Sequence, residues 1–138
     1  MNESAKIKVV IIGAGNMARE HIKVFSSIDS FSLEGIHSRT RKKAELLARD
    51  FQIPNVSESI NDLFLTTKAD LAIVAVSELS VYSVIQEVFK YPWVSIIEKP
   101  AGYNYENANS IKDYADKQKS QVFVSLNRRF YSSTRHIL

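Results

Sequence analysis

Short apolar runs alternate along most of the chain with segments of helical period. The runs cover residues 7–12, 31–37, 71–76, 94–97 and 122–126, and they are rich in Val and Ile. The run at 71–76 is apolar throughout, which is typical of a strand buried on both faces of a sheet. The repeated order of strand, helix and strand predicts a parallel sheet covered by helices. We therefore expect an α/β fold with a doubly wound parallel sheet in a three-layer α/β/α arrangement.

Four of the intervening segments carry an apolar stripe at the spacing of one helix face. The stripe residues are Ala18, Ile22 and Phe25; Ala44, Leu47, Ala48 and Phe51; Val81, Val84, Ile85, Val88 and Phe89; and Ala108, Ile111 and Ala115. Asn104 precedes the fourth segment and is suited to cap a helix N-terminus, and Pro54 closes the second unit. These signals predict four helices, the first of them over residues 16–27.

The composition is that of one ordinary globular domain, with 138 residues of which 45% are hydrophobic and 24% charged. Because cysteine is absent, disulfides and thiolate metal ligands are excluded, and we predict no metal site. The net charge of +3 suits a small anionic ligand but is too small for a nucleic-acid partner. No apolar run approaches the roughly 20 residues of a membrane span, and the N-terminus lacks the apolar core of a signal peptide. We therefore expect a cytoplasmic protein with no membrane partner.

The first predicted strand runs directly into a turn of the pattern G-x-G-x-x-A, which spans residues 13–18. Gly13 permits the tight turn, Gly15 lets the backbone approach a pyrophosphate, and Ala18 lets the helix pack close to the strand. The N–H groups at the helix start, among them those of Asn16 and Met17, are free to bind phosphates. This arrangement predicts a Rossmann-type dinucleotide-binding fold. The alternative is a glycine turn that only joins a strand to a helix.

The end of the second predicted strand bears on the choice of cofactor. NAD enzymes place an Asp or Glu there to bind the adenosine ribose, whereas this chain reads Ser38-Arg39-Thr40-Arg41. Hydroxyl and guanidinium groups suit the 2′-phosphate of NADP. We therefore predict NADP as the cofactor, with NAD as the alternative, and Ser38, Arg39 and Thr40 as binding residues. The arginines could instead only solvate the helix start, and a nucleic-acid role for this short basic segment is disfavoured.

Further motifs carry a resemblance to a known family. They are the glycine turn followed by Met17 and Ala18, Ser38-Arg39-Thr40 with Lys43-Ala44 behind it, the run from Asp70 to Val76, Glu98-Lys99-Pro100, and Asn127-Arg128-Arg129-Phe130. Together they resemble the glucose-fructose oxidoreductase, inositol dehydrogenase and rhizopine catabolism (Gfo/Idh/MocA) family, over nearly the whole chain. Members are NAD(P)-dependent oxidoreductases that act mostly on sugars and polyols.

The resemblance implies a catalytic role for Lys99 and a place near the cofactor for Glu98 and Asn127. Lys99 is implied to contact the reacting hydroxyl or carbonyl, and a lysine there can polarise the substrate oxygen and help move its proton. Asn127 is implied to lie near the nicotinamide ribose or the substrate. Backbone at Val76 and Ser77 is expected to touch the cofactor, although the chain departs here from the family's Thr-Pro-Asn and the histidine that follows it.

The remaining polar residues near these motifs leave alternatives open. Arg128 and Arg129 either bind acidic groups or form ion pairs. Glu78, which follows Ser77, would need a hydrogen-bonding partner to sit near phosphates. His21, on the first predicted helix, is interpreted as structural.

Family members are usually more than twice as long, and their second domain supplies an Asp-x-x-x-His pair that this sequence lacks. We expect residues 1–126 to form the NAD(P)-binding domain and residues 127–138 to begin the connection to an absent C-terminal substrate domain. A truncated chain would expose apolar surface and favour a homo-oligomer. The sequence thus predicts an oxidoreductase module for a small sugar-like substrate, incomplete by itself, and the alternative is a noncatalytic NADP-binding or sensing module that acts through a partner.

Overall fold

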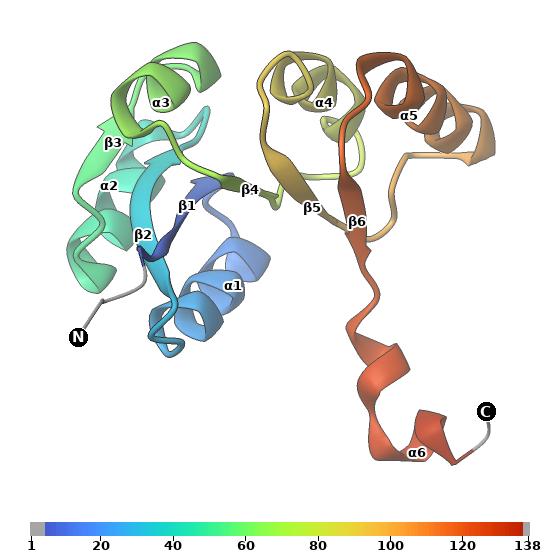
Figure 1. Cartoon of the computed structure of the whole chain (residues 1–138), viewed down its shortest axis with the longest axis horizontal. Helices are drawn as coiled ribbons and strands as arrows, with labels where there is room; N and C mark the ends of the chain where they lie inside the picture. Colours follow the sequence, from blue (N-terminus) through green and yellow to red (C-terminus); the bar gives the residue numbers. More distant parts are fainter. Residues whose placement is uncertain (1–4, 137–138) are drawn as a thin grey trace.

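The computed structural model describes residues 5–136, and its centre is one six-stranded parallel sheet. The strands are β1 (Ile7–Ile12), β2 (Phe31–His37), β3 (Asn55–Ser57), β4 (Leu71–Val74), β5 (Val94–Glu98) and β6 (Val122–Ser125). Their order across the sheet is β3-β2-β1-β4-β5-β6, so the order reverses between β1 and β4 (Figure 1). In open sheets of this kind ligands bind at the carboxyl ends of the strands, beside the point of reversal.

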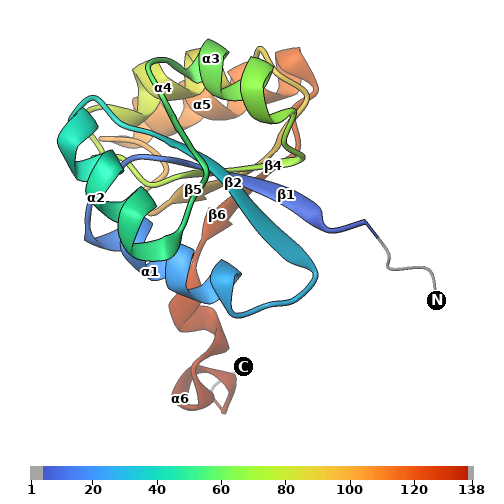
Figure 2. The same cartoon turned by 90° about the vertical axis from the view of Figure 1, so that its left-hand side faces the viewer.

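Helices cover both faces of the sheet, as Figure 2 shows. The helices are α1 (Asn16–Ser26), α2 (Arg41–Phe51), α3 (Ile60–Thr67), α4 (Val81–Val88) and α5 (Tyr105–Gln118), followed by the 3-10 turn η1 (Asn127–Phe130) and the short α6 (Ser132–Arg135). One core contains residues of α1 and α2, and the other contains residues of α3, α4 and α5. Successive residues of β1, such as Val9 and Val10, belong to opposite cores. The predicted three-layer, doubly wound fold is confirmed.

The helix ends follow the local signals in part. The Asn104 side chain accepts a hydrogen bond from the Asn107 N–H at 2.8 Å, which confirms the predicted cap of α5. The strand predicted over residues 71–76 is too long, because β4 ends at Val74 and the chain turns toward α4. The Ala75 N–H still donates to the Ile12 carbonyl at 2.8 Å, which draws the chain toward the end of β1.

Two elements, β3 and α3, lie in the stretch 55–70, where the sequence analysis sets no boundaries. β3 has three residues and is too short to show an alternating pattern. α3 starts after Ser59, whose side chain accepts a hydrogen bond from the Asp62 N–H at 3.0 Å. That contact is an N-cap of the usual kind.

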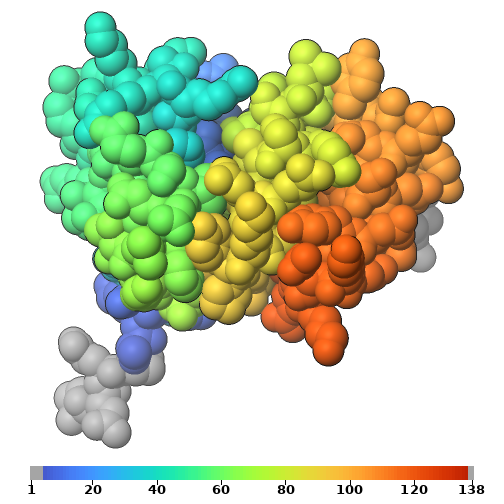
Figure 3. Space-filling model, turned by 90° about the horizontal axis from the view of Figure 1, so that it is seen from above, coloured from blue at the N-terminus to red at the C-terminus, as the bar shows by residue number. Residues whose placement is uncertain are grey.

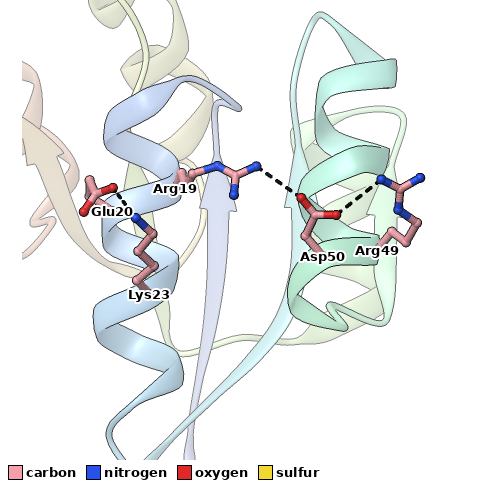
Figure 4. A network of polar contacts seen from close by, with 5 residues as sticks. All are labelled: Arg19, Glu20, Lys23, Arg49 and Asp50. Carbon is pink, nitrogen blue, oxygen red and sulfur yellow. Dashed lines mark hydrogen bonds and ion pairs between the residues drawn. The ribbon is translucent and has the colours of Figure 1, made fainter.

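On the opposite face, ion pairs join α1 to α2 (Figure 4). Arg19 of α1 lies 3.1 Å from Asp50 of α2, and Arg49 lies 3.3 Å from the other oxygen of the same carboxylate. Lys23 pairs with Glu20 on the outer side of α1 at 2.7 Å. Because all of these groups are at least one-third exposed, each pair contributes at most about 1 kcal/mol to stability.

Beyond β6 the chain leaves the sheet and continues through η1 to α6 (Figure 1). Neither η1 nor α6 buries a side chain, and Phe130 is 70% exposed. On the edge strand itself Phe123 is 61% exposed. The predicted boundary between a domain of residues 1–126 and a connection of residues 127–138 stays a prediction. Residues 1–4 of the first segment and residues 137–138 of the second lie outside the described residues.

Candidate functional site

The glycine turn stands where β1, β2 and β4 meet. Gly13 has φ +115°, a conformation that L side chains rarely adopt, and its N–H donates to the His37 carbonyl at 2.8 Å. A Cβ added at Gly13 would lie 2.2 Å from the Ala75 carbonyl oxygen. The fold therefore requires glycine at this position, because both the backbone conformation and the close approach of the β4 end exclude a side chain.

Gly15 is different, because nothing in the fold requires a glycine there. It is the residue before α1, with φ −88°, and a Cβ added to it would meet no atom within 4 Å. No side chain caps the N-terminus of α1, so its first N–H groups are free to bind an anion. Ala18 is fully buried at the contact of α1 with the sheet, as predicted for close packing. The open space beside Gly15 thus fits an approaching pyrophosphate.

A cleft of about 490 Å³ opens beside this turn, and we call it the glycine-turn cleft. Its lining comes from the turn, from the end of β2 with the start of α2, from α3, and from the segment 75–87. The lining residues are Ile12, Gly13, Ala14, Gly15, His37, Ser38, Arg39, Thr40, Lys43, Ile60, Ala75, Val76, Ser77, Ser80, Ser83, Val84 and Glu87. Figure 3 shows blue atoms from the N-terminal part of the chain between the cyan start of α2 and the yellow-green α4.

Seven of the predicted cofactor-binding residues line this cleft, and two others lie near it. The seven are Gly13, Gly15, Ser38, Arg39, Thr40, Val76 and Ser77. Asn16 and Met17 are exposed in the first turn of α1, outside the cleft lining. The sequence analysis missed Lys43 and Glu87 as lining residues. Lys43 could have been found from its place in the first turn of α2, close in sequence to Arg39, whereas Glu87 reaches the cleft only through the packing of α4.

The two arginines at the start of α2 have different surroundings. Arg41 Nε donates to Glu45 at 2.7 Å, and a second nitrogen contacts Glu58. The hydrogen bond to Glu45, followed by that to Glu58, raises the pKa of Arg41. Arg39, by contrast, has no ion pair within residues 5–136 and lines the cleft. The free guanidinium in the cleft is thus that of Arg39.

The end of β2 carries an imidazole where NAD enzymes place a carboxylate. His37 Nδ1 lies 3.0 Å from the Ser57 carbonyl oxygen. Because a carbonyl only accepts hydrogen bonds, Nδ1 carries a proton and donates it to Ser57. This side of the cleft, with His37, Arg39 and Lys43, therefore offers cationic and neutral groups but no carboxylate.

A second, smaller hollow of about 160 Å³ lies farther along the same edge of the sheet, and we call it the Lys99 hollow. Its lining consists of Lys99, Leu126, Asn127, Arg128 and Arg129. The predicted catalytic Lys99 and the predicted Asn127 are thus brought together. Lys99, Arg128 and Arg129 form no ion pair with any residue in the range 5–136. The described residues therefore give no support to the alternative in which Arg128 and Arg129 form ion pairs.

Glu98 precedes Lys99 but lines neither the cleft nor the hollow. Its Oε1 lies 2.6 Å from His21 Nε2, and the two side chains are 8% and 15% exposed. The contact joins α1 to the end of β5, consistent with a structural role for His21. The peptide bond between Lys99 and Pro100 is cis. A cofactor contact by Glu98 stays a prediction.

A six-stranded parallel sheet in this order, with a glycine turn at its reversal point and a cleft beside that turn, defines a dinucleotide-binding domain of the Rossmann type. Residues 7–126 match the family model described as oxidoreductase family, NAD-binding Rossmann fold (GFO_IDH_MocA). The chain therefore belongs to the Gfo/Idh/MocA family, as its motifs suggest.

Similar proteins include several sugar and polyol dehydrogenases. Glucose-6-phosphate 3-dehydrogenase of Bacillus subtilis is 27% identical over 128 residues, which cover 91% of this chain. The myo-inositol dehydrogenase of Lactobacillus casei, solved with NAD(H) and myo-inositol, has a TM-score of 0.87 at 21% identity over 96% of this chain. UDP-N-acetylglucosamine 3-dehydrogenase GnnA of Acidithiobacillus ferrooxidans has a TM-score of 0.84 at 16% identity over 97% of this chain. The chain spans between 35% and 43% of the length of these three relatives.

Neither a membrane-spanning helix nor a cluster of metal-ligating side chains is found in residues 5–136. None of the helices there is both long and apolar enough to cross a membrane. The same residues contain no group of three or more His, Asp or Glu side chains that could hold a metal ion.

Proposed function

We propose that this chain is the NADP-binding module of an oxidoreductase that acts on a hydroxyl or carbonyl group of a sugar, polyol or related small molecule. The observation that carries the proposal is Arg39, an exposed guanidinium without an ion pair in the described chain, which lines a cleft beside the glycine turn. With Lys43 on the same lining, the cleft offers two cations at the end of β2. That is the position where the adenosine ribose is recognised in folds of this type.

The residues present fit a nicotinamide dinucleotide phosphate. The free N–H groups of α1 and the open space beside Gly15 suit the pyrophosphate. Ser38, Arg39, Thr40 and Lys43 suit the 2′-phosphate, because hydroxyl and cationic donors bind phosphate oxygens through charge-assisted hydrogen bonds. The bound nicotinamide supplies hydride exchange with a substrate carbon. Val76 and Ser77 continue the lining along the sheet edge from the cleft toward β5.

Lys99 is the residue that we propose to act on the substrate. It follows β5 and lines the hollow on the side of β4 away from the glycine turn. From there its ammonium group would donate a hydrogen bond to the reacting oxygen and would hold or release a proton at Nζ as the oxygen changes charge. Asn127, on the same hollow, would orient the substrate or the nicotinamide ribose.

A noncatalytic NADP-binding or sensing module is the second candidate, and the positions of the histidines favour it. His21 contacts Glu98, His37 contacts Ser57, and His136 lies outside both the cleft and the Lys99 hollow. Lys99 therefore has no histidine beside it in the hollow. Loss of a general acid or base lowers a rate by about 100- to 10,000-fold. We propose that turnover depends on groups supplied by a further domain.

The cofactor assignment is tested by titrating the chain with NADPH and with NADH, using calorimetry. We expect NADPH to bind at least about tenfold more tightly, because one charge-assisted contact is worth about 1.5–3 kcal/mol. Arg39→Ala should remove this preference and leave NADH binding nearly unchanged. The matched control is Arg41→Ala, which removes an arginine already held by Glu45 and Glu58 and should keep the preference. Equal affinity of the wild-type chain for both cofactors would reject the NADP assignment.

Turnover is a separate question with its own assay. The chain is incubated with NADP and a panel of sugars and polyols, and NADPH formation is followed by absorbance, with Lys99→Ala as the comparison. Hydride transfer that is lost in Lys99→Ala supports the oxidoreductase. Tight NADPH binding without turnover on any member of the panel supports the noncatalytic module.

A further inference from the structure

Part of the lining of the glycine-turn cleft comes from α3, α4 and the residue before α4. Ser80, Ser83, Val84 and Glu87 line it, and their spacing places them along one side of α4. Ile60, the first residue of α3, also lines the cleft. Ile60 is 3% exposed and Val84 is half-buried against the same core. This part of the cleft is therefore apolar along its sides, with polar groups of α4 at its border.

Glu87 is the one carboxylate among the lining residues of this cleft. The remaining charged residues of the lining are Arg39 and Lys43, with His37 beside them as the third titratable group. The Glu87 side chain has no hydrogen-bond or ion-pair partner within residues 5–136. A phosphate next to Glu87 would be repelled, so the ligand group that faces it must be one that donates hydrogen bonds.

The donors of the proposed cofactor narrow the choice of that group. They are the ribose hydroxyls, the amino group of the nicotinamide carboxamide, and the exocyclic N6-amino group of adenine. The ribose hydroxyls lie close to the phosphates, which the glycine turn and the cations hold. The nicotinamide end belongs toward β5 and Lys99, on the other side of β4. The adenine amino group is what remains for Glu87, and the half-buried side chain of Val84 suits the flat face of a purine.

We propose that Glu87 is a specificity-determining residue that accepts a hydrogen bond from the N6-amino group of adenine. The inference rests on the proposed function, because it needs a nicotinamide adenine dinucleotide in the cleft. Two groups of lining residues then recognise different parts of the cofactor. Arg39 and Lys43 distinguish NADP from NAD by binding the 2′-phosphate, and Glu87 distinguishes adenine from bases that lack the amino group. A cofactor whose base presents an acceptor in place of the amino group should bind less well.

The test compares NADPH with its deamino analogue, in which hypoxanthine replaces adenine and a carbonyl oxygen replaces the amino group. Both are titrated by calorimetry into the wild-type chain, Glu87→Gln and Glu106→Gln. Glu106→Gln is the control because it removes the same charge from exposed α5, outside the cleft. We expect the wild-type chain to prefer NADPH by about tenfold, since a hydrogen bond to a charged group is lost and two acceptors come to face each other.

Glu87→Gln should lose or invert that preference, because its amide nitrogen can donate to the hypoxanthine oxygen, whereas Glu106→Gln should keep it. Equal binding of NADPH and the deamino analogue by the wild-type chain, while the preference for NADPH over NADH persists, would overturn the role of Glu87 alone. The same holds if Glu87→Gln retains the full tenfold preference. Failure of the wild-type chain to bind either NADPH or NADH would overturn both this inference and the proposed function.

Discussion

The glycine-turn cleft and the Lys99 hollow lie at the same edge of the sheet but rest on different kinds of structure. The cleft, of about 490 Å³, is lined by residues of five elements or their connections, and Ile12, Ile60 and Ala75 among them are buried in the cores. The hollow, of about 160 Å³, is lined by the residue after β5 and by residues 126–129, where no side chain is buried. The cofactor side is thus fixed by the core, and the proposed substrate side is not.

The position of each region in the sheet explains this contrast. β1, β4 and β5 each have a neighbouring strand on both sides, so the glycine turn after β1 and Lys99 after β5 both follow strands that are held on either side. The contrast therefore concerns residues 126–129 of the hollow. β6 is an edge strand, and its Phe123 stays mostly exposed although it pairs in register with Ile96 of β5. Groups supported by central strands are held more rigidly than groups on a segment that leaves an edge strand. We infer that this chain can bind a cofactor more readily than it can turn over a substrate.

The largest effects are expected at the two glycines of the turn, and they should separate folding from binding. Gly13→Ala forces a side chain into φ +115° and toward a backbone oxygen 2.2 Å away, so unfolding free energy should fall by about 2–3 kcal/mol or more. Gly15→Ala meets no protein atom and should leave stability within about 1 kcal/mol of the wild type. Its methyl group would occupy the space proposed for the pyrophosphate, so NADPH binding should fall by at least about 100-fold.

Urea unfolding and NADPH titration of both variants check this pair. The account is contradicted if Gly15→Ala binds NADPH as tightly as the wild-type chain does. It is also contradicted if Gly13→Ala is as stable as Gly15→Ala, because the close contact between the ends of β1 and β4 would then contribute little to the unfolding free energy.

A smaller effect is expected at the contact between His21 on α1 and Glu98 at the end of β5. His21→Ala leaves the buried Glu98 carboxylate without this partner, which should lower the unfolding free energy by about 1–3 kcal/mol. The matched control is Lys23→Ala, which breaks the exposed Glu20 pair on the same helix and should cost less than about 1 kcal/mol. Urea unfolding measures both, and equal losses would show that the His21–Glu98 contact adds nothing beyond a surface pair.

The smallest effect is expected in the Lys99 hollow. The double change Arg128→Gln and Arg129→Gln removes two exposed charges that have no ion pair in residues 5–136. Stability should stay within about 0.5 kcal/mol of the wild type, as for most surface substitutions. NADPH affinity should change by no more than about twofold, because neither arginine lines the glycine-turn cleft in which the phosphates are proposed to bind, and salt screens exposed charges. A tenfold loss of NADPH affinity would contradict this expectation and would show that Arg128 or Arg129 binds the cofactor directly.

Much of the cofactor side could be predicted from the sequence because its determinants are local. The turn 13–18 follows a run of Val and Ile, and Ser38 and Arg39 follow the next strand, so both positions were found from neighbours in the chain. The carboxyl ends of parallel strands meet at one edge of a sheet, which brings these separate motifs together. Lys99 and Asn127, by contrast, were assigned to the site by the resemblance to the family and not by local pattern.

The missed parts depend on contacts that no local pattern encodes. Glu87 reaches the cleft because of the rotation and packing of α4, and its neighbours in the sequence give no sign of this. β3 has only three residues, which is too short for a periodic signal, and it is held by its pairing with β2. The His21–Glu98 contact joins residues 77 apart in the chain, so only the folded structure shows that the two are partners.

The most direct test of the central claim is a titration of the isotope-labelled chain with NADPH, followed residue by residue through amide chemical shifts. We predict saturable shifts, with one common dissociation constant, at Gly13, Gly15 and Ser38–Thr40, which line the glycine-turn cleft. The amide of Lys112, on the outer side of α5, should not move and serves as the internal control. The absence of saturable shifts in the cleft, or shifts that are largest on α5, would contradict the proposal that this domain binds its cofactor at the glycine turn.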